Sequence, residues 1–182
     1  MVRGDGGGRR VRAALSFTTL RLMGAMRIRV WIADQRLDLL SVDEVVASYP
    51  VSTAAKGVGE RDGSEQTPGG LHEVSEKIGV DTASGTVFVG REPTGEICTP
   101  ERFEADPHRD WILTRILWLQ GLEPGSNRGG NVDTRSRYIY IHGSPNESEL
   151  GTPASHGCIR MRNEDVIDLF DRVEVGTPVE IG

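Results

Sequence analysis

The sequence has only two cysteines, Cys98 and Cys158, among its 182 residues. Two cysteines are too few for a disulfide framework, although they could form a single bridge. Such a bridge would favour an oxidising compartment, but the cysteine count by itself does not decide the compartment. The composition therefore excludes a small fold held together by several disulfides, and it leaves open whether Cys158 is a free thiol.

Long apolar runs and an excess of positive charge are also missing. No continuous apolar stretch reaches the roughly 18 residues needed to cross a bilayer, so no segment is predicted to be inserted stably in a membrane. The formal net charge of −6 disfavours nucleic acid as a partner and gives no reason to expect an anionic membrane surface. The length favours one domain with its own core.

Residues 1–25 combine a basic start with a weakly apolar run that Arg21 interrupts. The run is poor in leucine, isoleucine and valine, which makes the segment a weak candidate for a signal peptide. We expect a disordered leader or a translation start assigned too early, because the first clear strand pattern opens at Met26. Residues 26–182 are expected to form the folded domain.

Alternation of apolar and polar residues predicts many short strands. A helix is an alternative for residues 111–122, but their β-branched and aromatic residues favour a strand. Residues 54–70, which are rich in glycine, and residues 91–110 are expected to be irregular. Strands are predicted in 27–34, 35–40, 44–53, 71–79, 85–90, 111–122, 136–143 and 176–181.

One segment, residues 163–173, has the pattern of an amphipathic helix. Asn163 is expected to cap it, and Glu164 and Asp165 suit the positive N-terminal end of a helix. The predicted apolar face consists of Val166, Ile167, Phe170 and Val173. The sequence as a whole predicts a mainly β domain with one or two short helices, not a βαβ repeat.

The stretch ASHGCIRM, residues 154–161, carries a candidate nucleophile. A free thiol has a pKa of about 8.5, so a catalytic Cys158 needs a base or a positive field. In an extended chain Arg160 shares a face with Cys158, where its charge would favour the thiolate and could hold a substrate carboxylate. Gly157 permits the unusual backbone conformation with which a turn presents amide groups to an oxyanion.

Four histidines are candidates for the base. His72 and His108 are expected to have surface or structural roles. His156 lies two residues from Cys158, whereas His142 ends the predicted strand 136–143 and can approach from a separate element. A nucleophile and its base usually come from different elements, which favours His142 and leaves His156 as the alternative.

Alternation places His142 beside Tyr138 and Tyr140, on the face opposite Ile139 and Ile141, which are expected in the core. A cooperating His142–Cys158 pair predicts that activity rises and falls with two apparent pKa values, so a flat profile between pH 5 and pH 9 would count against it.

Two other interpretations of Cys158 remain open at this stage. A disulfide with Cys98 would make Cys158 inert. A zinc site could combine His142, His156 and Cys158, but it lacks the close paired spacing of common zinc motifs and an obvious fourth ligand.

Taken together, the motifs resemble the YkuD-like L,D-transpeptidase catalytic domain. The resemblance rests on His142-Gly143 at a strand end and on SHGCIRM after an intervening loop. TPGGLHEV (67–74), YPVSTA (49–54) and the closing GTPVEI are similar to further segments of that family. The resemblance extends from about Met26 to Gly182.

The resemblance implies a β-sandwich with an open catalytic groove. Cys158 would be the nucleophile and His142 the general base, with the Gly143 carbonyl orienting the imidazole. Amide groups around Gly157 and Cys158 would form the oxyanion hole. The residues expected to contact substrate are Ser155, His156, Arg160 and Tyr140.

The family's reaction is acyl transfer on peptidoglycan stem peptides, without a metal or an organic cofactor. A thioester on Cys158 would form with release of D-alanine, and a neighbouring stem amine would then complete a 3–3 crosslink. Alternatives are hydrolysis of the same thioester by an L,D-carboxypeptidase, transfer to a lipoprotein lysine, or a non-catalytic wall-binding module. The resemblance implies a cell-envelope location, whereas the unclear export signal leaves a cytoplasmic one open. The sequence does not indicate an oligomeric state.

Overall fold

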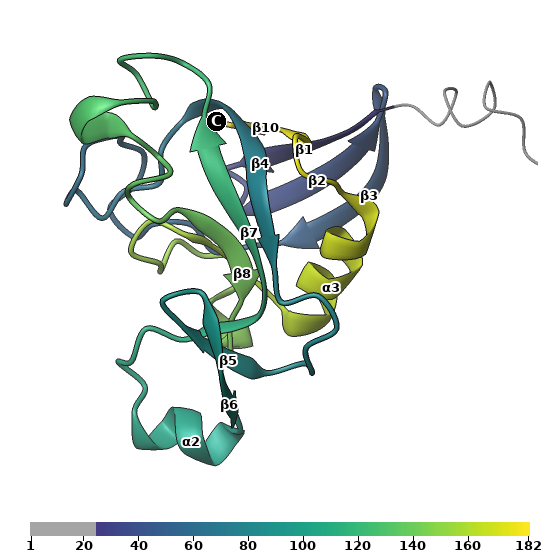
Figure 1. The fold of residues 1–182 in the computed structure, drawn as a ribbon, viewed down its shortest axis with the longest axis vertical. Coiled ribbons are helices and arrows are strands. Elements are labelled where there is room, and N and C mark those ends of the chain that lie inside the picture. The colour runs from purple at the N-terminus through teal and green to yellow at the C-terminus, as the bar shows by residue number, and fades with distance from the viewer. Residues whose placement is uncertain (1–24) are drawn as a thin grey trace, which may run out of the picture.

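The computed structural model describes residues 25–182, and the interpretation of the N-terminal segment as a leader lies outside them except for residue 25. The described chain forms ten strands and a few short helices (Figure 1). The strands are β1 (Met26–Trp31), β2 (Arg36–Ser41), β3 (Glu44–Pro50), β4 (Gly70–Ile78), β5 (Thr86–Val89), β6 (Glu92–Ile97), β7 (Ile112–Gly121), β8 (Tyr140–Gly143), β9 (Ile159–Met161) and β10 (Pro178–Ile181). The helices are α2 (Pro100–Ala105), α3 (Asn163–Arg172) and the 3₁₀ turns η1 (Gly130–Val132) and η2 (Glu147–Glu149).

All ten strands belong to one sheet, which folds back on itself. The main path runs β3-β2-β1-β10-β4-β7-β5-β6, and β8 branches from β7 and pairs with β9. Bridges between Ser52 and Arg160 and between Ala54 and Ser155 join the segment after β3 to the region of β9. Figure 1 shows β5, β6 and α2 extending away from the rest of the domain. The predicted mainly β fold is confirmed, with the layers formed by one bent sheet.

The main core lies between the bent sheet and α3. Val166, Leu169 and Phe170 are the buried residues of α3, and they pack against apolar side chains of the sheet. Burying one such side chain contributes about 1.5–3 kcal/mol, so this layer fixes α3 against β7 and β8. Neither α2 nor α3 has the length and apolar character needed to span a bilayer.

The strand predictions hold for most of the chain, including residues 111–122, and two expectations are wrong. Residues 91–110 are not irregular throughout, because they contain β6 and α2. Within 136–143 only Tyr140–Gly143 is strand, and Tyr138 has a φ of 56° in a turn. The reason is local: the Asp133 carboxylate accepts hydrogen bonds from the backbone and hydroxyl of Ser136, which stabilises a turn instead.

The predicted cap of α3 is also wrong. Arg162 occupies the N-cap position, and no side chain caps the helix there. Asn163 instead accepts a 2.5 Å hydrogen bond from the Thr114 hydroxyl through Oδ1, which ties the start of α3 to β7. Ile167 is only half-buried, and Leu169 takes its place in the buried face.

The long connection between β7 and β8 is organised by the buried side chain of Asn127. Its Nδ2 donates to the carbonyls of Gly69 and Leu71 at 3.0 and 3.1 Å, and its Oδ1 accepts from the Glu123 amide at 2.9 Å. Gly121 lies against the Asn127 backbone carbonyl so closely that a Cβ there would collide with it. This connection therefore has a defined path, which brings residues 137 and 138 to the site described next.

Candidate active site

Cys158 immediately precedes β9, at the end of a tight turn. Gly157 has a φ of +136°, and a Cβ on it would lie 3.1 Å from Ile139 Cδ1. Its carbonyl accepts a 2.9 Å hydrogen bond from Thr67 Oγ1. The turn therefore requires glycine at this position, because a side chain would be strained in this conformation and crowded by the core.

The amide groups of this turn differ in their partners. Ser155 is buried, and its hydroxyl donates to the Cys158 carbonyl at 2.5 Å and accepts from the Gly157 amide at 3.2 Å. Within residues 25–182, no acceptor takes the Cys158 amide hydrogen. Of the two amides expected at an oxyanion hole, that of Cys158 is the available donor.

His142 lies in β8, beside β9 in parallel register. Its Nδ1 is 2.8 Å from the Gly143 carbonyl oxygen. Because a carbonyl can only accept, this contact places the proton on Nδ1 and leaves the lone pair of Nε2 available. Asn163, Leu113 and Thr114 surround Gly143 closely and leave no room for a Cβ.

The Cys158 thiol has two backbone partners. Its Sγ accepts from the Tyr140 amide at 3.3 Å and donates to the Tyr138 carbonyl at 3.4 Å. No hydrogen bond joins Cys158 and His142 within residues 25–182. To lose its proton to Nε2, the thiol must first leave the Tyr138 carbonyl.

Cys158 and His142 line one groove of about 600 Å³. The predicted site residues Ser155, His156, Arg160 and Tyr140 line it as well. His156 is exposed, whereas Tyr140 is buried. The structure thus brings together residues from β8, the 154–158 turn and β9. The groove also has members that sequence reasoning missed, among them Asp110, Arg137 and Arg91.

Burial dominates the ionisation of the pair. It raises the pKa of the Cys158 thiol to about 12, against smaller effects of the Tyr140 amide and of the Arg160 and Arg137 charges, which lower it. Burial likewise lowers the pKa of His142 to about 4, against the Gly143 hydrogen bond, which raises it. The Arg160 charge favours the thiolate, as expected, but burial outweighs it, so the resting site holds a neutral thiol and a neutral imidazole.

This burial has a cause that strand alternation does not reveal. Ile139 and Ile141 lie in the main core, as predicted. The opposite face is buried too: Tyr140 packs in a second apolar cluster with Phe88 and Ile116, and His142 is only 1% exposed. Both faces of β8 are thus shielded from water.

Two of the arginines in the groove are already bound to protein groups. Arg160 Nη1 forms an ion pair with Glu149 at 3.2 Å, and its side chain is only 17% exposed. Arg137 donates to the backbone carbonyls of Gly59, Glu60 and Gln66 and to the Ser64 hydroxyl. The sequence could have indicated Arg137 only through its closeness to Tyr138, since its partners lie some 70 residues earlier in the chain.

The structure bears on the disulfide and zinc interpretations of Cys158. Cys98 and Cys158 are both free thiols, and Cys98 packs beside Val87 and Trp111 instead. Within residues 25–182, no group of three or more histidine, cysteine or acidic side chains is arranged to hold a metal ion. His72 is buried and bonded to Gly70 and Thr134, so it has the structural role expected for it.

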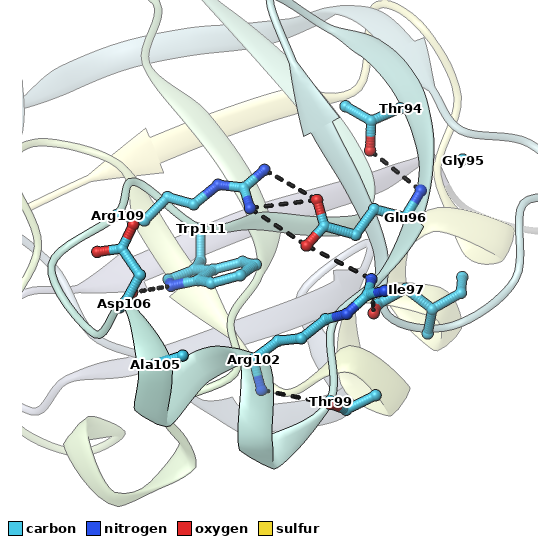
Figure 2. A pocket seen from close by; sticks show the side chains of 10 residues that line it. All are labelled: Thr94, Gly95, Glu96, Ile97, Thr99, Arg102, Ala105, Asp106, Arg109 and Trp111. Carbon is cyan, nitrogen blue, oxygen red and sulfur yellow. Dashed lines mark hydrogen bonds and ion pairs between the residues drawn. The ribbon is translucent and has the colours of Figure 1, made fainter.

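A second hollow, of about 850 Å³, lies between β6 and α2, beyond the groove. Figure 2 shows Glu96 between the guanidinium groups of Arg102 and Arg109, with Trp111 beside them. Glu96 is paired with both arginines, and no cysteine or histidine lines the hollow. The candidate catalytic residues therefore lie in the groove around Cys158 and not in this second hollow.

The buried histidines predict a loss of stability in mild acid. Burial lowers the pKa of both His142 and His72 below the ordinary 6.5. The unfolded chain then binds more protons, so this stability is complete above pH 6.5 and is lost as pH falls toward 4. From pH 7 to pH 5, His142 alone should lower the free energy of unfolding by roughly 2 kcal/mol. Urea unfolding at the two pH values measures this, and an equally steep pH dependence in His142→Gln would contradict it.

Comparison with known proteins identifies the family to which this domain belongs. The YkuD family model, described as the L,D-transpeptidase catalytic domain, matches residues 25–181. The segment that carries Cys158, His142 and the surrounding strands lies wholly within the match.

Curated relatives match over shorter segments. The chain is 48% identical over 44 residues to "Probable L,D-transpeptidase YbiS" of Escherichia coli. It is 49% identical over 45 residues to "Probable L,D-transpeptidase ErfK/SrfK" of Salmonella typhimurium. These segments cover 24% and 25% of this chain, and only 14% and 15% of the relatives.

Solved structures are similar over most of the described chain. An L,D-transpeptidase from Mycobacterium smegmatis has a TM-score of 0.52 at 16% identity, covering 87% of this chain and 59% of that one. An L,D-transpeptidase from Mycobacterium tuberculosis has a TM-score of 0.52 at 19% identity, covering 87% and 57%. At these identities the similarity shows the fold.

Proposed function

The chain belongs to the family of YkuD-type L,D-transpeptidase catalytic domains, and from that premise we propose that it is a cysteine-dependent L,D-transpeptidase forming 3–3 peptidoglycan crosslinks. The observation that carries the proposal is the convergence of Cys158 and His142 in one groove, with the imidazole oriented by the Gly143 carbonyl. The family acts on peptidoglycan, and a location in the cell envelope is part of the proposal.

Because Cys158 and His142 are both neutral in the resting site, the thiol proton is transferred to His142 as the sulfur attacks the substrate carbonyl. Nε2 of His142 takes the thiol proton as Sγ of Cys158 attacks the carbonyl of the third stem residue. The Cys158 amide, which has no acceptor among the described residues, donates to the oxyanion that develops. The proton then passes from Nε2 to the leaving nitrogen, D-alanine departs, and a thioester remains on Cys158.

The second half of the reaction runs through the same two residues. An amine at the D-centre of a neighbouring stem attacks the thioester, and Nε2 accepts its proton. Collapse of this second intermediate forms the amide crosslink and returns the proton to Sγ. No step requires a group that the chain does not supply, because the carboxylate of a triad is replaced by the Gly143 carbonyl as the partner that orients the base.

The direct test is incubation of the protein with purified muropeptides that carry tetrapeptide stems. We expect crosslinked dimer and free D-alanine in equal amounts, detected by mass spectrometry. Tripeptide without dimer would assign the chain as an L,D-carboxypeptidase. No change in the muropeptides at high enzyme concentration would contradict both activities.

A further inference from the structure

The third arginine of the groove, Arg91, differs from Arg137 and Arg160 in its surroundings. Arg160 is paired with Glu149, and Arg137 is bound by backbone carbonyls. Arg91 has no carboxylate partner within residues 25–182. Its only hydrogen-bond partner there is the Tyr140 hydroxyl, at 3.3 Å. Arg91 is therefore the cation of the groove that keeps most of its donors available.

Arg91 is nevertheless held in place. It lies in the two-residue turn between β5 and β6, with a φ of 71°, where Val89 pairs with Glu92. Its guanidinium lies 4.6 Å from the centre of the Trp118 ring and 5.2 Å from that of the Tyr138 ring. The two rings stack on each other, so they form a fixed support. A guanidinium stacked on aromatic faces is positioned before a ligand arrives, and its edge stays free to bind one.

Arg91 is linked to the Cys158 thiol through Tyr140. The Tyr140 residue that accepts its hydrogen bond also donates its backbone amide to Cys158 Sγ. Asp110 is the one acidic side chain among the described residues that line the groove, and three arginines line it. An anionic group near Cys158 is thus attracted to the groove, and Arg91 is where it finds unpaired donors.

We propose that Arg91 is a carboxylate-binding residue that positions the acyl-donor peptide against Cys158. This inference rests on the proposed function, which supplies the peptide. Two carboxylates of such a peptide have the required chemistry: the C-terminal carboxylate of the leaving residue and a side-chain carboxylate elsewhere on the stem. The guanidinium of Arg91 binds one of them through paired N–H donors.

The assignment differs from the expectation that Arg160 holds the substrate carboxylate. To do so, Arg160 would have to release Glu149 and lose the 3.2 Å ion pair. Arg91 loses no ion pair on binding a carboxylate. Its existing contacts, to a phenol and two ring faces, are compatible with a ligand on its open edge.

The test compares Arg91→Gln and Arg91→Lys with the matched control Arg135→Gln. Arg135 also lies over the Trp118 ring, at 4.2 Å, but it is paired with Glu76 and does not line the groove. Each variant is given three synthetic donor peptides: unmodified, amidated at the C-terminus, and amidated at the side-chain carboxylates. Release of the C-terminal residue gives kcat and KM, and circular dichroism confirms folding.

For the unmodified peptide, Arg91→Gln should raise KM about 10-fold or more, the loss expected for a charge-assisted hydrogen bond, while kcat changes little. Arg91→Lys should restore part of the affinity, and Arg135→Gln should resemble the wild type. The peptide whose amidation abolishes the difference between wild type and Arg91→Gln identifies the bound carboxylate. Equal effects of Arg91→Gln and Arg135→Gln, or an unchanged Arg91→Gln penalty with both amidated peptides, would overturn the proposal.

Binding without turnover separates this inference from the proposed function. In a Cys158→Ala background, the same peptides are titrated and binding is followed by isothermal titration calorimetry. If the wild type turns over none of the peptides, the proposed function fails, and the titration still tests Arg91. A Kd that Arg91→Gln leaves unchanged would contradict the carboxylate site even where the wild type is active.

Discussion

Replacing Cys158 with alanine is expected to abolish the release of D-alanine from a tetrapeptide stem, with a loss of at least about 1000-fold. The loss follows because no other described side chain in the groove is a thiol. With wild-type protein, intact mass spectrometry should show an adduct equal to the donor peptide minus D-alanine. The Cys158→Ala variant should show none.

Cys98 provides the matched control. It is a free, partly buried thiol beside Trp111, outside the groove. The Cys98→Ala variant should keep its activity and form the same adduct. Adduct formation that depends on Cys98, or full activity in Cys158→Ala, would exclude the mechanism. Cys158→Ser, which is close in size, separates loss of the nucleophile from loss of packing.

Replacing His142 with alanine is expected to lower kcat by about 100- to 10,000-fold, the usual contribution of a general base. The variant removes the only described imidazole whose Nδ1 is fixed by the Gly143 carbonyl. The exposed His156 is the alternative base, and its replacement should reduce activity less than 10-fold. A large loss in His156→Ala together with an active His142→Ala would reverse the assignment.

The pH profile gives an independent check on His142. Because its pKa is about 4 and that of Cys158 is about 12, the neutral pair should persist from about pH 5 to pH 9. The rise and fall of activity between pH 5 and pH 9 that the sequence predicted is therefore not expected, because burial displaces both pKa values outside this range. For the wild type, kcat/KM should be flat there and should fall below pH 5 as His142 is protonated. Circular dichroism at each pH separates this limb from acid unfolding.

The fold was predictable where local pattern and burial agree. Strict alternation in residues 27–34 and the β-branched run of 111–122 indicate strands, whatever the neighbouring strands in the sheet are. Residues 91–110 misled because their strand and short helix are stabilised by contacts with one another, such as the Glu96 ion pairs with Arg102 and Arg109. Such contacts leave no periodic apolar pattern in the sequence.

The candidate site, like the fold, has features that local sequence predicts and features that depend on distant contacts. Sequence determined the candidate pair, since Cys158 follows a glycine turn and His142 ends an alternating strand. The alternation that puts Arg160 on the same face as Cys158 also puts Ile159 and Met161 on the opposite face, where both are buried in the core. The role of Asn163 was missed, because its partner Thr114 is 49 residues away in the chain.

The sequence alone therefore determined which residues could react and that they lie on strand ends of a mainly β domain, because periodicity and residue chemistry are local properties. Only the tertiary structure decided the ionisation of the pair, since burial outweighs the nearby arginines at Cys158 and the Gly143 hydrogen bond at His142. It also decided which arginine is available. Folding places Glu149 against Arg160 and, within residues 25–182, leaves Arg91 without a carboxylate partner.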